Sequence, residues 1–310
     1  MPALVAGIHV FLAVKKAWMG GTSPAMTTEG LVTLDPRVNA YRPDLAASHL
    51  RGQVEAAQFV DGVDYEVVEP IADLRRTPLP DAALDTQALY GERVTIYETT
   101  DEGWAWGQLA IDGYVGWFAA NALAKPGLTP THTVIVPRTL AFPAADIKQP
   151  PLAAPPMGAA LTVSTQDERF AVTANGWHIP AMHVAPLGSA YGDFVSVAEM
   201  FLGTPYLWGG KSTLGIDCSG LVQIALQAAG RMCPRDSDMQ EASLGAPIAL
   251  NNLRRGDLLF WPGHVAIACA SDAIVHANAH HMMVAREPVE QALTRIMKAG
   301  SELRAVKRPS

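Results

Sequence analysis

The sequence predicts a multidomain protein in which two small all-β barrels precede an α+β domain. Short stretches of alternating apolar and polar residues, separated by turn residues, recur between residues 61 and 188, and this spacing favours small barrels. From residue 189 onward the pattern changes to a strong helix candidate followed by several strands. A chain of 310 residues is long enough for two or three such domains.

Changes in composition divide the chain into five segments. The first two lie ahead of the barrels, and the second contains a helix candidate from Ala46 to Phe59. We expect a disordered or non-native extension over residues 1–28, an N-terminal arm over 29–60, a first barrel over 61–126, a second barrel over 127–188 and the α+β domain over 189–310.

The amino terminus contains an apolar stretch, Ala3 to Val14, of about the length of a signal-peptide core. Its charges, Lys15 and Lys16, follow that core instead of preceding it. The stretch is also shorter than the roughly 20 residues that a transmembrane helix needs. We therefore expect no membrane span and a cytoplasmic location, with a periplasmic or secreted location as the alternative if the segment is an atypical export signal.

The composition excludes several classes of function. A net charge of −7 argues against a nucleic-acid binder, because contact with phosphates needs a basic face. The three cysteines are an odd number and form no C-x-x-C pair, which argues against a disulfide framework or a structural zinc site. The sequence implies no cofactor, and free thiols are the simpler interpretation.

The barrel segments contain recognisable strands. In the first barrel Gly116-Trp117 is a notable pair, since glycine permits a close approach and we expect the indole to cap the barrel core. Gly176-Trp177 repeats the pair in the second barrel. The expected strands are Tyr65–Val68, Arg93–Glu98, Trp104–Ala110 and Tyr114–Ala119 in the first barrel, and His132–Val136, Leu161–Ser164 and Phe170–Thr173 in the second.

Cys218 is the candidate nucleophile. The apolar residues that follow it recur at helical spacing as far as Ala229, and Gly230 is a plausible end of the helix. Cys218 would then lie in the first turn, where the helix dipole and free N–H groups favour the thiolate. The alternative is a cysteine that packs in the core, and this is the role we assign to Cys233 and Cys269.

A thiol nucleophile needs an imidazole that takes and returns its proton, and His264 and His276 are placed for this. If Ala270-Ser271-Asp272 forms a hairpin loop, opposing residues have numbers that sum to 542. The two histidines are then diagonal neighbours on one face, roughly 7–8 Å apart at Cα. This arrangement suits His264 as base and His276 as the residue that orients it.

The C-terminal segment resembles the NlpC-type cell-wall peptidases, which are papain-like cysteine peptidases. The resemblance covers most of residues 190–310 and implies a Cys-His-His triad at Cys218, His264 and His276, with an oxyanion position near the Cys218 N–H. The motifs that carry it occur in order: Pro205-Tyr206-Leu207-Trp208-Gly209-Gly210, Asp217-Cys218-Ser219-Gly220, Pro234-Arg235-Asp236-Ser237, Arg255-Gly256-Asp257-Leu258-Leu259-Phe260 and Gly263-His264-Val265-Ala266-Ile267.

The first barrel resembles the bacterial SH3-like domain through residues 87–94 and 112–117. We expect residues 127–188 to form a second SH3-like barrel. This domain order is similar to that of the γ-D-glutamyl-L-diamino-acid endopeptidases, also called dipeptidyl-peptidase VI. The resemblance implies a murein peptide substrate whose free amino end, L-Ala-γ-D-Glu, is held in a pocket. An ammonium group pairs there with carboxylates. The implied pocket residues are Asp217, Ser219, Asp236, Ser237, Tyr114 and, as a second acidic contact, Asp85. A turn or a helix cap is the alternative for Asp236 and Ser237.

The sequence also departs from the family pattern. Ser271-Asp272-Ala273 replaces the usual glycine-containing turn, and Asn278, His280 and His281 are additional. Together with His276, these two histidines suggest a metal, but no motif such as H-E-x-x-H is present and no metal site is expected. Two other functions stay open, namely a thiol acyltransferase or amidase on the same fold and a catalytically silent wall-binding protein.

Overall fold

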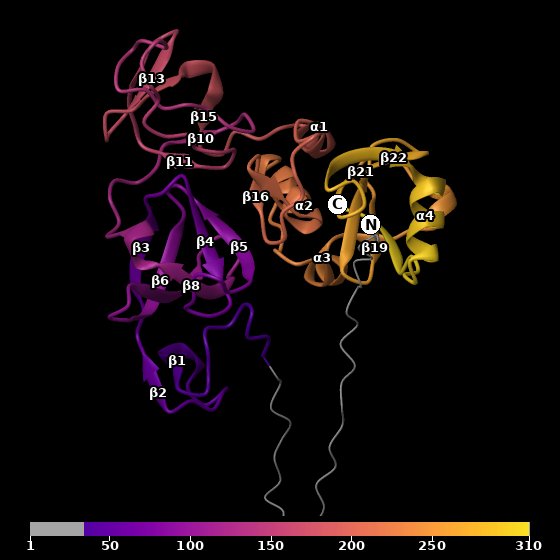
Figure 1. Ribbon diagram of the computed structural model, residues 1–310, viewed down its shortest axis with the longest axis horizontal. Coiled ribbons are helices and arrows are strands. Elements are labelled where there is room, and N and C mark those ends of the chain that lie inside the picture. The colour runs from indigo at the N-terminus through magenta and orange to yellow at the C-terminus, as the bar shows by residue number, and fades with distance from the viewer. Residues whose placement is uncertain (1–33, 310) are drawn as a thin grey trace, which may run out of the picture. The chain divides into compact units, whose positions relative to one another are not determined.

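The computed structural model describes residues 34–309 (Figure 1). The extension expected over residues 1–28 lies outside the described residues, as do the first five residues of the expected arm. Within residues 34–309, no helix has both the length and the apolar character that crossing a membrane requires.

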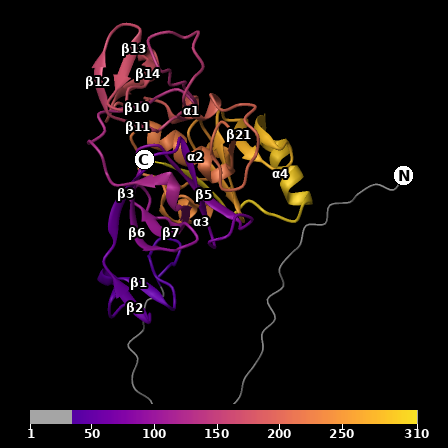
Figure 2. The same ribbon diagram turned by 60° about the vertical axis from the view of Figure 1, so that its left-hand side comes forward.

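The arm is extended, and the helix predicted from Ala46 to Phe59 is wrong. It consists of strand β1 (Leu45–Ala47), a 3-10 turn (Ser48–Leu50) and strand β2 (Gln58–Val60), and the two strands pair in parallel (Figures 1 and 2). Gly52 has a φ of 82°, which an α-helix does not accommodate. Apolar burial decides the conformation, because Leu45, Ala47 and Leu50 pack on two indoles of the barrel.

The first barrel is built from a seven-stranded sheet with the order β5-β4-β8-β7-β6-β3-β9. Its own core includes Leu74, Val94 and Phe118. The sequence pattern located four of the strands, but it did not predict β4, β5 or β9. The elements are β3 (Val63–Val67), β4 (Ile71–Arg75), β5 (Leu84–Leu89), β6 (Arg93–Thr99), β7 (Trp104–Leu109), β8 (Val115–Ala119), a 3-10 turn (Ala120–Ala122) and β9 (Leu123–Ala124).

The Gly116-Trp117 pair has two separate roles. A Cβ atom at Gly116 would lie 2.2 Å from a side-chain atom of Leu74, so only glycine fits between β8 and β4. Trp117 does not cap the barrel core as expected. It packs with Trp106 against the arm, where the Arg42 guanidinium lies 4.2 Å and 4.9 Å from the two rings.

Residues 127–188 form two three-stranded sheets around a core that contains Leu161 and Ile179. The first sheet has the order β11-β10-β15 and the second β12-β13-β14 (Figure 2). A second SH3-like barrel over this segment stays a prediction. The elements are β10 (His132–Val134), β11 (Ala160–Leu161), β12 (Val163–Gln166), β13 (Phe170–Thr173), β14 (His178–Pro180), a 3-10 turn (Ala181–His183) and β15 (Val184–Pro186).

The C-terminal domain centres on a six-stranded sheet with the order β18-β23-β19-β20-β21-β22. Alternate residues of its strands enter two clusters, one shared with α1 and α2 and one with α4 (Figure 1). The helices are α1 (Phe194–Glu199), α2 (Cys218–Ala228), α3 (Ser237–Ser243) and α4 (Val289–Lys298), with a 3-10 turn at Leu250–Asn252. The strands are β16 (Lys211–Ser212), β17 (Gly215–Ile216), β18 (Ala246–Pro247), β19 (Leu258–Trp261), β20 (His264–Ala268), β21 (Ala273–Asn278), β22 (Met283–Pro288) and β23 (Ala305–Arg308).

Two local predictions in this domain are confirmed. Helix α2 begins at Cys218, is capped by the Asp217 side chain, which accepts from Gly220 N–H, and is followed by Gly230 at a φ of 73°. Strands β20 and β21 pair Ile267 with Val275, so that the register sums to 542 as expected. Both features depend on residues close together in the sequence.

Candidate active site

One pocket contains Cys218 together with every residue expected to hold the substrate. Its volume is about 390 Å³, within the range of small-molecule sites. The arm, the first barrel and the C-terminal domain each supply part of its lining, which consists of Arg37, Arg76, Asp85, Tyr114, Tyr206, Trp208, Asp217, Cys218, Ser219, Asp236, Ser237, Asp238 and Gly263.

Cys218 begins α2, which packs on β20, and its side chain is buried. Burial raises the pKa of the Cys218 thiol to about 12, and the neighbouring Asp217 carboxylate adds to the rise. The amide of Val265, the residue after His264, acts in the opposite direction. Burial therefore acts against the thiolate that the helix N-terminus favours. Neither Cys233 nor Cys269 lines the pocket.

His264 and His276 lie side by side on β20 and β21, as the hairpin register predicted. His264 Nε2 is 2.8 Å from His276 Nδ1, and the ring centroids are 5.0 Å apart. The indole of Trp261 lies on another side of His264, at a centroid distance of 5.6 Å. Burial, with smaller contributions from His276 and Arg295, lowers the pKa of His264 to about 3. Burial thus disfavours the charged form of both groups, the Cys218 thiolate and the His264 imidazolium.

Glu287 extends this pair and was missed in the sequence. His276 Nε2 is 2.7 Å from Glu287 Oε1, and Arg295 from α4 forms an ion pair with the same oxygen. The signal that could have found Glu287 is the next hairpin, since β21 pairs with β22 through His276 and Ala285. Glu287 is thus the diagonal neighbour of His276.

Asp217 and Ser219 line the pocket but are already engaged by Arg235. This arginine is 1% exposed, and its NH2 and NH1 groups lie 2.7 Å and 3.0 Å from the two Asp217 oxygens. NH1 also donates to Ser219 Oγ at 2.9 Å, and Nε donates to Thr86 Oγ1 of the barrel at 2.7 Å. Asp217 therefore builds the pocket floor instead of offering a free carboxylate. Arg235 belonged to a recognised motif but had been given no role.

Asp236 is the carboxylate that faces both the barrel and the arm. Although it occupies the N-cap position of α3, its side chain makes no cap hydrogen bond, contrary to the alternative of a helix cap. Its Oδ2 instead accepts from Tyr114 Oη at 3.1 Å and from Arg37 at 2.9 Å. Burial raises the pKa of Asp236 even though Arg235, Tyr114 and Arg37 act against the rise. Arg37, which also binds Asp238, was not anticipated.

Asp85 lies on the barrel side of the same pocket. Its carboxylate is paired with Arg76, whose NH2 is 2.6 Å from Asp85 Oδ1, and the Asp85 side chain is 10% exposed. Ser237 lines the pocket from the first residue of α3. The structure thus brings Asp85 and Ser237 to the pocket, as expected.

A metal could be considered at His276, His281 and Glu287, whose ligand atoms lie within 4.8 Å of one another. These atoms already have partners, because His276 bonds to His264 and Glu287, and His281 Nδ1 is 2.9 Å from Asn278 Oδ1. A cation there would also lie beside a guanidinium ion pair. The donor set therefore fits a hydrogen-bonded chain better than a metal site.

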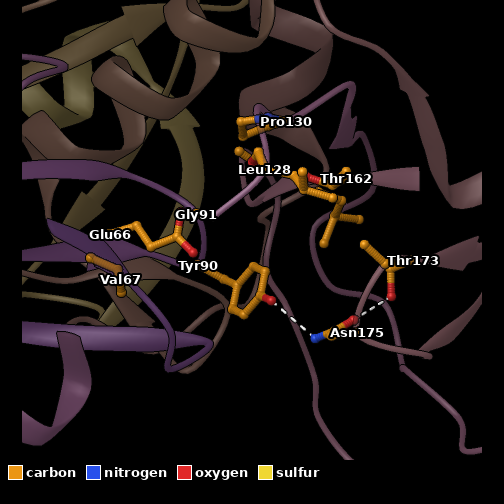
Figure 3. Close-up of a pocket in the computed structure, with 12 residues that line it drawn as sticks. Glu66, Val67, Tyr90, Gly91, Leu128, Pro130, Thr162, Thr173 and Asn175 are labelled. Atoms are coloured by element: carbon orange, nitrogen blue, oxygen red, sulfur yellow. Dashed lines mark hydrogen bonds between the residues drawn. The ribbon is translucent and has the colours of Figure 1, made fainter. Parts of the chain in front are cut away.

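A separate hollow of about 250 Å³ lies where the first barrel meets residues 128–175. Figure 3 shows the Tyr90 side chain pointing toward Asn175, whose Nδ2 donates to the Tyr90 hydroxyl at 3.0 Å. Asn175 is in turn bonded to Thr173. The twelve residues that line this hollow include neither cysteine nor histidine, so the hollow offers no thiol and no imidazole.

Comparison with known families agrees with this division of the chain. Residues 203–299 match the NlpC/P60 family. The C-terminal domain is an NlpC/P60 domain. Residues 74–123 match the bacterial dipeptidyl-peptidase Sh3 domain, which places an SH3 domain ahead of the NlpC/P60 domain.

Curated relatives resemble parts of this chain. It is 43% identical over 86 residues to "Dipeptidyl-peptidase 6" of Lysinibacillus sphaericus, covering 28% of this chain and 32% of the relative. It is 30% identical over 201 residues to "Gamma-D-glutamyl-L-lysine dipeptidyl-peptidase" of Bacillus subtilis, covering 58% of this chain and 65% of the relative. The chain thus spans less than two thirds of the length of each.

A solved NlpC/P60 family protein from Bacillus cereus has a similar fold. It superposes with a TM-score of 0.67 at 20% sequence identity, over 79% of this chain and 99% of that protein. At this identity the likeness concerns the fold alone. It extends beyond the NlpC/P60 domain to most of the chain.

Proposed function

We propose that this protein is a cysteine peptidase that hydrolyses the bond between the γ-carboxyl of D-Glu and a diamino acid in cell-wall peptides with a free N-terminal L-Ala. The observation that supports this most strongly is the pocket itself, in which Cys218 shares a wall with Asp236 and Tyr114. The names of the two curated relatives favour the same activity.

The proposed reaction uses neutral partners at the start. His264 takes the thiol proton as the Cys218 sulfur bonds to the γ-carbonyl carbon. The carbonyl oxygen becomes an oxyanion, for which the Cys218 N–H at the start of α2 is the proposed donor. The C–N bond then breaks, and His264 returns the proton to the leaving amine of the diamino acid. Water hydrolyses the thioester in a second cycle and frees L-Ala-D-Glu and the thiol.

Asp236 is the proposed partner of the substrate's ammonium group. Among residues 34–309, the hydrogen bonds that Asp236 accepts from Tyr114 and Arg37 both go to Oδ2, and a carboxylate offers about four lone-pair positions. The raised pKa of Asp236 reflects a buried carboxylate whose burial its neighbours do not fully offset. An ammonium group would supply the missing compensation, so a free amino end becomes a requirement for binding.

The test is cleavage of L-Ala-γ-D-Glu-meso-diaminopimelate and of its L-Lys counterpart by the purified protein, followed by mass spectrometry. We expect release of L-Ala-D-Glu, abolished by Cys218→Ala and retained by the matched control Cys233→Ala. Comparing the two peptides determines which diamino acid is preferred. Failure to cleave either would refute the proposed bond specificity.

The amino-end requirement has its own control. Acetylation of the L-Ala amine should abolish cleavage, because it removes the charge that Asp236 would pair with. Equal cleavage of the acetylated peptide would show that the pocket does not select a free amine. Transfer of the acyl group to an added amine, in preference to water, would instead favour the acyltransferase alternative.

A further inference from the structure

Glu287 is the last member, counted from His264, of a chain of hydrogen-bonded side chains. The chain runs through neighbouring strands, with 2.8 Å between His264 Nε2 and His276 Nδ1 and 2.7 Å between His276 Nε2 and Glu287 Oε1. The His276 side chain is fully buried, and that of Glu287 is 9% exposed. In such a chain, whether the last member donates or accepts a hydrogen bond decides which nitrogen of each preceding imidazole carries the hydrogen.

The identity of the last member decides where each proton sits. An ionised carboxylate only accepts hydrogen bonds, so His276 Nε2 must carry a hydrogen. His276 Nδ1 is then an acceptor, which requires a hydrogen on His264 Nε2. The other nitrogen of His264, Nδ1, is therefore bare and is the only atom of the ring that can accept the thiol proton.

Glu287 is held in its ionised form by its surroundings. The Arg295 guanidinium forms an ion pair with the same oxygen that faces His276. Burial acts against ionisation, but the hydrogen bonds from His276 and Arg295 outweigh it and lower the pKa of Glu287 to about 2. The carboxylate is thus an acceptor at every pH at which a cysteine hydrolase works.

The charges around the pair come from three elements. Glu287 on β22 raises the pKa of both histidines, Arg295 on α4 lowers it for both, and His281 after β21 lowers that of His276. Loss of the Glu287 charge would leave Arg295 opposing protonation of His264 without compensation. His264 would then be a weaker base, and its ring hydrogen would no longer be confined to one nitrogen.

We propose that Glu287 is a positioning residue that fixes the proton arrangement of His264 and His276, so that Nδ1 of His264 is the base for Cys218. This inference rests on the proposed function only in assigning Cys218 and His264 their roles. Glu287 acts through His276 and has no contact with the substrate in this proposal. An amide in its place could turn its NH₂ group toward His276 and reverse every hydrogen bond in the chain.

The first test observes the tautomer directly. In ¹⁵N-histidine spectra at neutral pH we expect His264 to be protonated at Nε2 in the wild-type protein, and Glu287→Gln to show a mixture or the opposite tautomer. The matched control is Glu290→Gln, which removes an exposed glutamate from the first turn of α4. A wild-type His264 protonated at Nδ1 would overturn the inference whether or not any peptide is cleaved.

The second test measures reactivity as a function of pH. In Glu287→Gln, alkylation of Cys218 by iodoacetamide at pH 7 should slow on the order of 10-fold, and the acidic limb of the pH profile of the alkylation rate should move to lower pH. In peptide cleavage by the same variant, kcat should fall about 10- to 100-fold while KM stays within twofold. Glu287→Asp, which keeps the charge, should recover most of the rate. An unchanged pH profile in Glu287→Gln, or equal losses in Gln and Asp variants of normal stability, would overturn the proposal. Alkylation needs no substrate, so this test stands even if the peptides are not cleaved.

Discussion

Truncating Arg235 to alanine should lower the free energy of unfolding by roughly 3–5 kcal/mol, the usual effect of breaking a buried ion pair on one side. The arginine is 1% exposed and its partner Asp217 is 7% exposed. The two parallel hydrogen bonds between them measure 2.7 Å and 3.0 Å. Without the guanidinium, Asp217 would stay buried with only the N–H groups of the α2 N-terminus and of Gly209, and the Ser219 hydroxyl, as donors.

The magnitude follows from what remains after the truncation. Arg235 also donates to Thr86 and Ser219, and the loss of these two hydrogen bonds is included in the expected roughly 3–5 kcal/mol. Water that enters the vacated space offsets part of this. Removing both charges with Arg235→Met and Asp217→Asn should restore much of the stability, since a buried pair replaced as a whole is often neutral and asparagine also caps a helix.

Urea unfolding followed by far-UV circular dichroism, with equal m-values, measures these differences. The control is Arg304→Ala, because Arg304 is 56% exposed and lies 3.6 Å from Glu241; its removal should change stability by less than about 1 kcal/mol. If Arg235→Ala lowers the free energy of unfolding no more than the control does, the buried ion pair does not have the proposed weight. The same follows if the double variant is as unstable as Arg235→Ala.

Three further outcomes are expected. Burial lowers the pKa of His264 from 6.5 to about 3, so as pH falls the unfolded chain takes up a proton on this histidine before the folded protein does. The free energy of unfolding therefore decreases as pH falls below about 6.5, by up to about 1.4 kcal/mol per pH unit from this group. Urea titrations at pH 7 and 5 should show a weaker pH dependence in His264→Gln, and an equal dependence would contradict this assignment. Tyr114→Phe removes the 3.1 Å bond to Asp236 and should raise KM about 2- to 12-fold with little change in kcat; a fall in kcat alone would count against a binding role. Gly116→Ala would place a Cβ 2.2 Å from a side-chain atom of β4, whereas a Cβ at the control position Gly192 would meet open space. Thermal unfolding should therefore show a loss of stability of roughly 1–3 kcal/mol for Gly116→Ala and none for Gly192→Ala.

The features that the sequence predicted correctly depend on residues close together in the chain. The start of α2 follows from Asp217 and the apolar spacing behind it, and its end follows from Gly230. The pairing of His264 with His276 follows from the length of one hairpin loop. Extending the same counting to the next hairpin would have reached Glu287. Local geometry therefore sufficed for the pair of histidines.

The features that the sequence did not predict depend on contacts between distant segments. Arg37 and Asp236 are 199 positions apart, and Arg235 and Thr86 are 149 apart, so no spacing rule relates them. The arm was expected to be helical, but burial against Trp106 and Trp117 selects an extended conformation. The burial of Cys218, which raises the pKa of its thiol, likewise depends on the assembled domain and could not be read from the neighbouring residues.

The pocket of Cys218 has a consequence for how enzymes of this design could diversify. Arg37, Asp85 and Tyr114 all precede residue 127, whereas the nucleophile and both histidines follow residue 188. A fragment beginning at residue 189 would keep the reacting groups but lose pocket residues that belong to the side proposed to face the amino end of the peptide. We expect such a fragment, if it folds, to accept chains that continue past the L-Ala position. Gain or loss of the non-catalytic segments ahead of residue 189 would then convert an enzyme that trims free ends into one that cuts within a polymer, with no change in its chemistry.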